Sequence, residues 1–171
     1  GSDNDIDSDL AWDITTGGTT ANGDEIVVCV IEPGGANYNH NDLVANHWVN
    51  MDEIPNNGVD DDLNGYIDDY NGWDPQSNSD NISAGGHGTA VSGMIGAKGN
   101  NGTGGAGVNW DVRIMQVEVS SLTESNVISS YAYPQTMRNL YNTSGGVRGA
   151  FVVATNASWG IDNANPANYP V

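Results

Sequence analysis

The chain has 171 residues, 37% of them hydrophobic, and this length and composition fit one globular domain with a buried core. Four Lys and Arg residues stand against 22 Asp and Glu residues, so the formal net charge is −18 at pH 7. A surface of this charge repels phosphate groups, which excludes nucleic acids and anionic membranes as partners and favours hard cations, although solubility alone can explain many of these carboxylates.

The first half of the chain predicts a short helix, a buried strand and a long irregular region. Residues 8–14 precede a Gly-Gly pair and predict the helix. The run EIVVCVI at residues 25–31 is apolar and β-branched throughout, which is typical of a strand covered on both faces in a parallel sheet. Residues 33–86 are rich in Asn, Asp and Gly, and irregular regions of this length usually carry function or bind a ligand.

The second half alternates helices and strands. Residues 87–97 predict a helix of small side chains, and residues 113–119 and 150–156 predict two further buried strands. A capping box at SLTE, residues 121–124, predicts a helix that runs to about residue 142 and is kinked or split by Pro134. Strands that alternate with helices predict an α/β fold with a doubly wound parallel sheet flanked by helices.

The segment NNGVDDDLNGYIDD, residues 56–69, predicts a Ca²⁺ site. Its D-x-D-x-N-G spacing matches an EF-hand loop, in which alternate oxygens converge on the ion and Gly65 allows a sharp turn. The expected oxygen donors are Asp60, Asp62, Asn64, the carbonyl of Tyr66, and Asp68 or Asp69. Asn71 replaces the usual Glu at the twelfth position and no flanking helices are evident, so we expect a calcium loop without an EF-hand. The alternative is a solvated acidic turn.

Four segments together resemble one family. VIEPGGANYNHNDL (residues 30–43), GHGTAVSG (86–93) and NASWG (156–160) resemble the acid, histidine and substrate-binding segments of subtilisin-like serine proteases, and AWDITTG (11–17) resembles the entry to their catalytic domain. The resemblance implies a subtilisin-like fold, peptide-bond hydrolysis, and an N-terminal portion of a peptidase domain over residues 1–171. The acidic segment would then be a calcium-loop insert around residues 56–71.

By the same resemblance, His87 is the general base and Glu32 is the acid that orients it. Glu32 departs from the family, which has Asp-Thr-Gly or Asp-Ser-Gly where this chain has Glu-Pro-Gly. The alternatives are that His87 is a helix-capping or surface histidine and that Glu32 is a structural replacement without a catalytic role. Ser158, Trp159 and Gly160 would form the extended edge that binds the substrate backbone, or else a strand end with a core Trp.

The resemblance also implies a second Ca²⁺ site after the histidine helix. Its ligands would be Asp42, Gly99, Asn101, Thr103 and Gly105. The alternative is that this glycine-rich loop is only a turn.

The nucleophile segment of the family, of the type GTSMAxP, does not occur in residues 1–171. We therefore expect the serine on a C-terminal part of the same protease, bound as a second chain. The resemblance thus predicts a secreted, extracellular serine endopeptidase that acts on peptides or proteins. The main alternative is a non-catalytic, calcium-stabilised module of protease-like fold that binds peptides or partners, and Glu32 favours it. A third alternative is a plain secreted calcium-binding domain, but it would make the occurrence of three family motifs in the family's order a coincidence.

Overall fold

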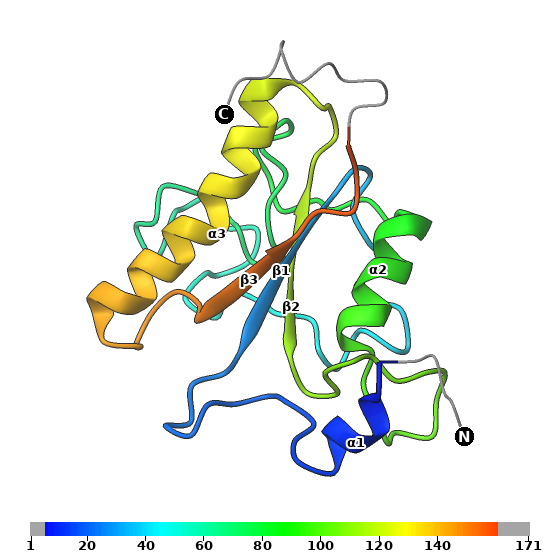
Figure 1. Cartoon of the computed structure of the whole chain (residues 1–171). Coiled ribbons are helices and arrows are strands. Elements are labelled where there is room, and N and C mark those ends of the chain that lie inside the picture. The colour runs from blue at the N-terminus through cyan, green and yellow to red at the C-terminus, as the bar shows by residue number, and fades with distance from the viewer. Residues whose placement is uncertain (1–5, 161–171) are drawn as a thin grey trace, which may run out of the picture.

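The computed structural model describes residues 6–160. In this part a short first helix is followed by strands and helices in strict alternation (Figure 1). The elements are α1 Ser8–Trp12, β1 Val27–Glu32, α2 Gly86–Gly96, β2 Arg113–Glu118, α3 Glu124–Ser144 and β3 Val152–Asn156. The predicted strands, and the helix expected over residues 87–97, are therefore confirmed with ends shifted by one or two residues.

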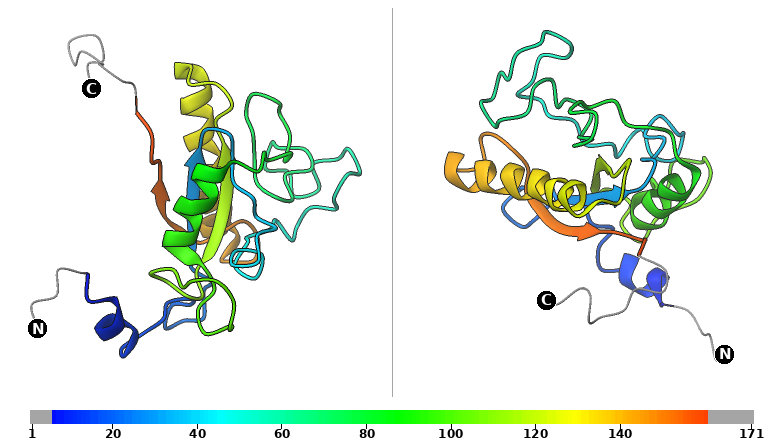
Figure 2. Two further views of the ribbon diagram at one scale, coloured as in Figure 1. Left: turned by 90° about the vertical axis from the view of Figure 1, so that its right-hand side faces the viewer. Right: turned by 90° about the horizontal axis from the view of Figure 1, so that it is seen from above.

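The three strands form one parallel sheet in the order β2-β1-β3. The connections run through α2 and α3, which lie on opposite faces of the sheet (Figures 1 and 2). The prediction of a doubly wound α/β sheet is confirmed. Because the strands are parallel, the carboxyl ends of β1, β2 and β3 lie together at one end of the sheet. Folds of this kind place their binding and catalytic sites at that end.

The larger core lies on the face covered by α3 and the irregular region. It joins Cys29 and Ile31 of β1, Met115 and Val117 of β2, Tyr133 and Met137 of α3, and Trp48 and Trp73 between β1 and α2. On the other face, Val30 and Ile114 pack against Val91 and Ile95 of α2. Full burial of each large apolar side chain contributes roughly 1.5–3 kcal/mol, so these two clusters fix both helices on the sheet.

Helix α3 differs from its prediction at its start and at its proline. The N-cap is Thr123, whose hydroxyl accepts the Asn126 N–H, so the helix begins after Thr123 rather than at Ser121. Pro134 lies inside one continuous helix and does not split it. Burial of Tyr133 and Met137 on the sheet holds the helix on both sides of the proline and offsets the lost backbone hydrogen bond.

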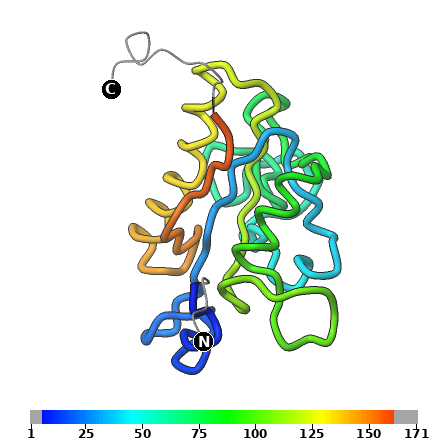
Figure 3. The backbone as a smooth tube through the Cα atoms, turned by 45° about the vertical axis from the view of Figure 1, so that its right-hand side comes forward, coloured from blue at the N-terminus to red at the C-terminus, as the bar shows by residue number. Residues whose placement is uncertain are grey.

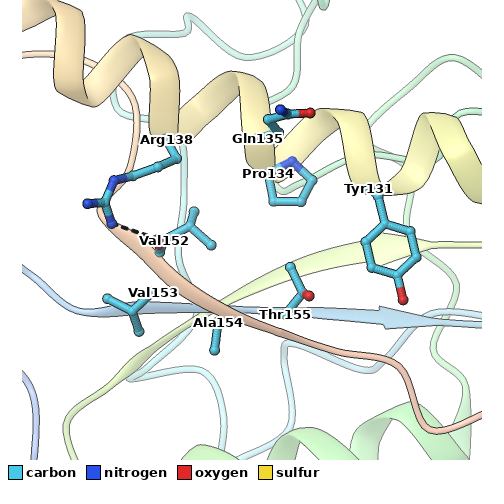
Figure 4. Close-up of a pocket in the computed structure, with 8 residues that line it drawn as sticks. All are labelled: Tyr131, Pro134, Gln135, Arg138, Val152, Val153, Ala154 and Thr155. Carbon is cyan, nitrogen blue, oxygen red and sulfur yellow. Dashed lines mark hydrogen bonds between the residues drawn. The ribbon is translucent and has the colours of Figure 1, made fainter.

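Strand β3 is not buried on both faces, and that part of the prediction is wrong. Val153 is 49% exposed, and Ala154 and Thr155 are also exposed. The physical reason is that β3 lies at an edge of the sheet and, among residues 6–160, pairs with no strand but β1. Figure 4 shows the groove of about 380 Å³ between β3 and α3, across which Arg138 donates to the Val152 carbonyl.

The opposite edge of the sheet is closed by the irregular region between β1 and α2, which Figure 3 follows as a tube. The Trp48 N–H donates to the Ile114 carbonyl, and Trp73 exchanges backbone hydrogen bonds with Gln116 and Glu118 of β2. Most of the remaining region stands away from the sheet as a lobe (Figure 2). Among the helices of residues 6–160, none is both long and apolar enough for a membrane span.

Candidate active site

Glu32 and His87 meet at the carboxyl end of β1. The Glu32 side chain is fully buried, whereas that of His87, at the second position of α2, is 63% exposed. Glu32 Oε2 lies 2.8 Å from His87 Nδ1. The carboxylate therefore holds the ring through Nδ1 and leaves Nε2 as the nitrogen that can exchange a proton with a reacting group. This is the arrangement of a general base oriented by an acid.

Glycines bring the two residues together. The turn after Glu32 closes with a hydrogen bond from the Gly35 N–H to the Glu32 carbonyl, and Gly35 has a φ of +63°. A Cβ on Gly35 would overlap the Ser83 carbonyl oxygen, and a Cβ on Gly88 would overlap the Gly35 carbonyl oxygen. The first turn of α2 thus packs directly on the backbone after β1, which places the imidazole beside the carboxylate.

The predicted substrate-binding residues reach the same point. The Ser158 N–H donates to Glu32 Oε1 at 2.7 Å, and the Trp159 indole N–H donates to the Ile31 carbonyl at 2.8 Å. Trp159 packs partly against the larger core, while Ser158 and Gly160 are exposed. The segment after β3 is therefore attached to the end of β1 at Glu32, the residue that also contacts the candidate base.

A second buried glutamate stands beside this site, and the sequence analysis missed it. Glu118 ends β2 in direct register with Glu32 and is 4% exposed. Its Oε2 accepts the Ser83 N–H at 2.6 Å, and its Oε1 accepts the Ser120 hydroxyl. Glu118 therefore holds the segment that leads into α2. The signal for it was a charged residue within the apolar run RIMQVEV.

The acidic loop, residues 53–69, brings several carboxylates together, and one of them, Glu53, was not predicted. Glu53, Asp60 and Asp62 each offer an oxygen, and these oxygens lie within 4.8 Å of one another. Glu53 also accepts the N–H groups of Asp61, Asp62 and Asp68, and burial raises its pKa. Glu53 escaped the sequence analysis because it precedes the D-x-D-x-N-G spacing by seven residues.

The other predicted ligands of this loop have different partners. Asn64 donates to Asp62 and Asp69, and Gly65 donates to Asp60, so the loop is already folded around its oxygens. The carboxylate of Asp68 accepts the N–H groups of residues 57 and 58. Tyr66 packs edge-on against the rings of Trp73 and Tyr133 in the core.

Asp69 joins this loop to the core. Its carboxylate accepts the Tyr133 hydroxyl at 2.8 Å and the Asn50 amide at 3.0 Å. Burial raises the pKa of Asp69 to about 6, and burial also raises the pKa of Asp62, which shares Asn50 with it. Both pKa values are raised because burial keeps the negative charges away from water.

The loop after α2 presents part of the second predicted ion site. Asp42 Oδ2 accepts the Gly105 N–H, and Asp42 Oδ1 is buried without a hydrogen-bond partner among the described residues. The Asn101 side chain accepts the Thr103 N–H. Gly99 packs against the Trp110 ring. The structure thus brings Asp42 to the loop, with one carboxylate oxygen available to a cation.

Comparison with known proteins gives a family and several relatives. The model of the Subtilase family matches residues 23–169. Subtilisin-like protease 1 of Plasmodium vivax is 49% identical over 90 residues, and that of Plasmodium berghei is 44% identical over 93 residues. These alignments cover 52% and 53% of this chain but only 14% and 15% of the relatives. The chain therefore spans a small part of the curated relatives that it matches.

Proposed function

The chain belongs to the subtilase family of serine proteases, and from this membership and the geometry of Glu32 and His87 we propose that it supplies the catalytic base of a serine endopeptidase. Residues 1–171 would be the N-terminal portion of the peptidase domain, with the calcium-loop insert around residues 56–71. The observation that carries the proposal is the contact of the buried Glu32 carboxylate with Nδ1 of the exposed His87 ring.

In the proposed reaction, a serine hydroxyl attacks the carbonyl carbon of a peptide bond. His87 Nε2 takes the hydroxyl proton, and the buried Glu32 carboxylate stabilises the imidazolium through Nδ1. His87 then returns that proton to the leaving amine as the C–N bond breaks. Water then attacks the ester formed on the serine, with His87 again as base, and His87 returns the proton to the serine oxygen as the ester bond breaks and the acid product leaves. Ser158, Trp159 and Gly160 would hold the substrate backbone as an added strand.

Replacement of Glu32 by Gln tests this assignment in the protein that carries the serine. A neutral amide cannot stabilise imidazolium as a carboxylate does, so we expect kcat/KM for a peptide substrate to fall by about 10⁴-fold while the fold stays intact. His87→Ala should give a loss of at least similar size. Unchanged turnover in Glu32→Gln, with circular dichroism as in the parent, would remove Glu32 from the mechanism.

We propose further that the acidic loop binds Ca²⁺. Support comes from the three converging oxygens of Glu53, Asp60 and Asp62, from the raised pKa of Asp62, and from the left-handed backbone of Leu63 and Gly65, with φ of +58° and +96°, which curls the loop around them. Binding to the folded state alone raises stability with free Ca²⁺. We expect the melting temperature of the parent to rise with Ca²⁺, and that of the double variant Asp60→Ala/Asp62→Ala to rise much less. A parent whose melting temperature responds to neither Ca²⁺ nor EDTA would contradict the site.

The second Ca²⁺ site is proposed at Asp42, with Gly99, Asn101, Thr103 and Gly105 as the remaining ligands. The unpartnered buried oxygen of Asp42 supports it. Isothermal titration of Asp42→Asn against the parent counts the ions: the variant should bind one Ca²⁺ fewer. An unchanged count would leave the loop as a turn.

The serine and the remaining wall of the cleft are proposed to come from a C-terminal part of the same protease, bound as a second chain. The open edge of β3 and the exposed side chain of His87 support this arrangement. Secretion is proposed with it, because a calcium loop of this type is filled at extracellular Ca²⁺ concentrations.

The second candidate is a non-catalytic peptide-binding module. Glu32 favours it, because an acid one methylene longer than the family's aspartate stands at the catalytic position. Peptide binding without hydrolysis, in a folded and calcium-loaded protein that contains the serine, would decide for the module.

A further inference from the structure

Glu32 has two carboxylate oxygens, and each is engaged by a different part of the site. Oε2 contacts His87 Nδ1 at 2.8 Å, and Oε1 accepts the Ser158 N–H at 2.7 Å. The side chain is completely buried, so water does not compete for either oxygen. One carboxylate thus connects the candidate base on α2 with the candidate substrate segment after β3.

The second contact replaces sheet pairing that has stopped. Register between β1 and β3 ends at Val30 and Asn156. Beyond this pair the chain stays attached to β1 through the Ser158 N–H on Glu32 and the Trp159 indole on the Ile31 carbonyl. A side-chain carboxylate therefore does what a backbone carbonyl does within the ladder.

We propose that Glu32 is the positioning residue of the substrate-binding segment as well as of His87, and that it couples the two. A buried carboxylate oxygen without a partner is strongly unfavourable, so loss of either contact weakens the support of the other. A peptide that orders residues 158–160 then also orders the imidazole. The inference rests on the proposed peptidase function.

The length of glutamate fits this double role. Aspartate is shorter by one C–C bond, about 1.5 Å. Withdrawal of the carboxylate by that distance would take a contact of 2.7 or 2.8 Å beyond hydrogen-bond range for at least one of the two partners. The proposal therefore accounts for a glutamate at this position.

Nuclear magnetic resonance of the chain tests the proposal without any catalytic step. In Glu32→Gln the acceptor of the Ser158 amide loses its charge in either orientation of the new side chain, so the Ser158 amide proton should move upfield. The His87 ring nitrogens should change in the same variant, because one amide group cannot accept from both partners. In Glu32→Asp, the Ser158 amide proton, the His87 ring nitrogens or both should also differ from the parent, because the shorter carboxylate cannot reach both partners.

Glu118→Gln is the matched control, because it makes the same change in a buried glutamate at the same sheet end. It should shift the Ser83 amide proton and leave the Ser158 amide unchanged, and any response of the His87 ring should be smaller than in Glu32→Gln. A Ser158 amide that ignores Glu32→Gln while the His87 ring responds would overturn the coupling and leave the proposed function standing. A His87 ring that ignores the change would remove Glu32 from the catalytic assignment itself.

Kinetics of the active protease give a second readout. Glu32→Asp should raise KM for peptide substrates and also lower kcat, because the substrate segment and the base are both released. His87→Ala should lower kcat with KM little changed. A Glu32→Asp variant with the KM of the parent overturns the positioning role in substrate binding, whatever its kcat.

Discussion

At the scale of single residues, two buried groups give opposite pH dependences. Burial lowers the pKa of His47 to about 4 from 6.5, so between these values the unfolded chain binds the proton and stability is lost as pH falls. Burial raises the pKa of Asp69 to about 6 from 3.8. Between pH 3.8 and about 6 the folded chain therefore binds the proton, and stability is lost as pH rises. Each contribution is on the order of 3 kcal/mol, and the two largely cancel.

Asp69→Asn removes one side of this balance. Without Ca²⁺, the variant should be more stable than the parent at neutral pH, because a buried charge is gone, and should lose stability more steeply as pH falls from 6.5 to 4. The new side chain still offers an oxygen to the Tyr133 hydroxyl. Urea unfolding across this range measures both curves, and parallel curves for the two proteins would contradict the assignment.

Gly88 has no room for a side chain. A Cβ there would overlap the Gly35 carbonyl oxygen and press on Glu32, so Gly88→Ala should destabilise the fold by about 1–3 kcal/mol and displace His87. Gly93→Ala in the same helix meets open space and should stabilise by about 0.5–1 kcal/mol. Thermal unfolding compares the two, and equal effects would refute the close contact between α2 and the turn after β1.

At the scale of elements, the start of α3 separates two hydroxyls that the sequence could not rank. The sequence analysis used Ser121 as the cap, whereas the structure uses Thr123. Thr123→Ala should therefore cost about 1 kcal/mol of stability, and Ser121→Ala less than about 0.5 kcal/mol. Chemical denaturation of both variants is the measurement. The reverse order would restore the earlier helix start.

The elements that could be predicted are those whose signal is local. The apolar run before Glu32 and the small residues after His87 define β1 and α2 by themselves, and the family resemblance predicted that the two meet. Glu53 and Glu118 could not be placed, because each approaches its site through a loop or a strand register that no local pattern records.

Strand β3 was misjudged for the same reason. Its composition predicts burial, but burial depends on a neighbour, and β1 is the only strand paired with it within residues 6–160. An apolar run in a sequence says that a strand prefers to be covered. It does not say which polypeptide provides the cover.

At the scale of the whole molecule, the two sheet edges differ. Trp48 and Trp73 close the edge at β2, whereas β3 is flanked by open grooves on both faces, one against α3 and one against α2. An exposed edge with apolar residues is a surface that proteins normally cover. The proposed C-terminal part would cover it and bring the serine toward His87.

Hydrogen exchange tests this arrangement. In the chain alone, amides of β3 that face away from β1 should exchange fast, and those of β1 slowly. In a protein that also contains the C-terminal part, the β3 amides should become protected while those of β1 change little. Size-exclusion chromatography with mass spectrometry should then find both polypeptides together. A stable monomer of this chain with β3 already protected would contradict the open edge.

The central claim is that His87, held by Glu32, serves a nucleophilic serine. Labelling with a fluorophosphonate probe in the protein that contains both parts tests it most directly, because the probe reacts only with an activated serine hydroxyl. The parent should be labelled at one serine, and His87→Ala, folded and calcium-loaded to the same extent, should not. A folded parent that takes up no probe, or equal labelling of the parent and His87→Ala, would contradict the account.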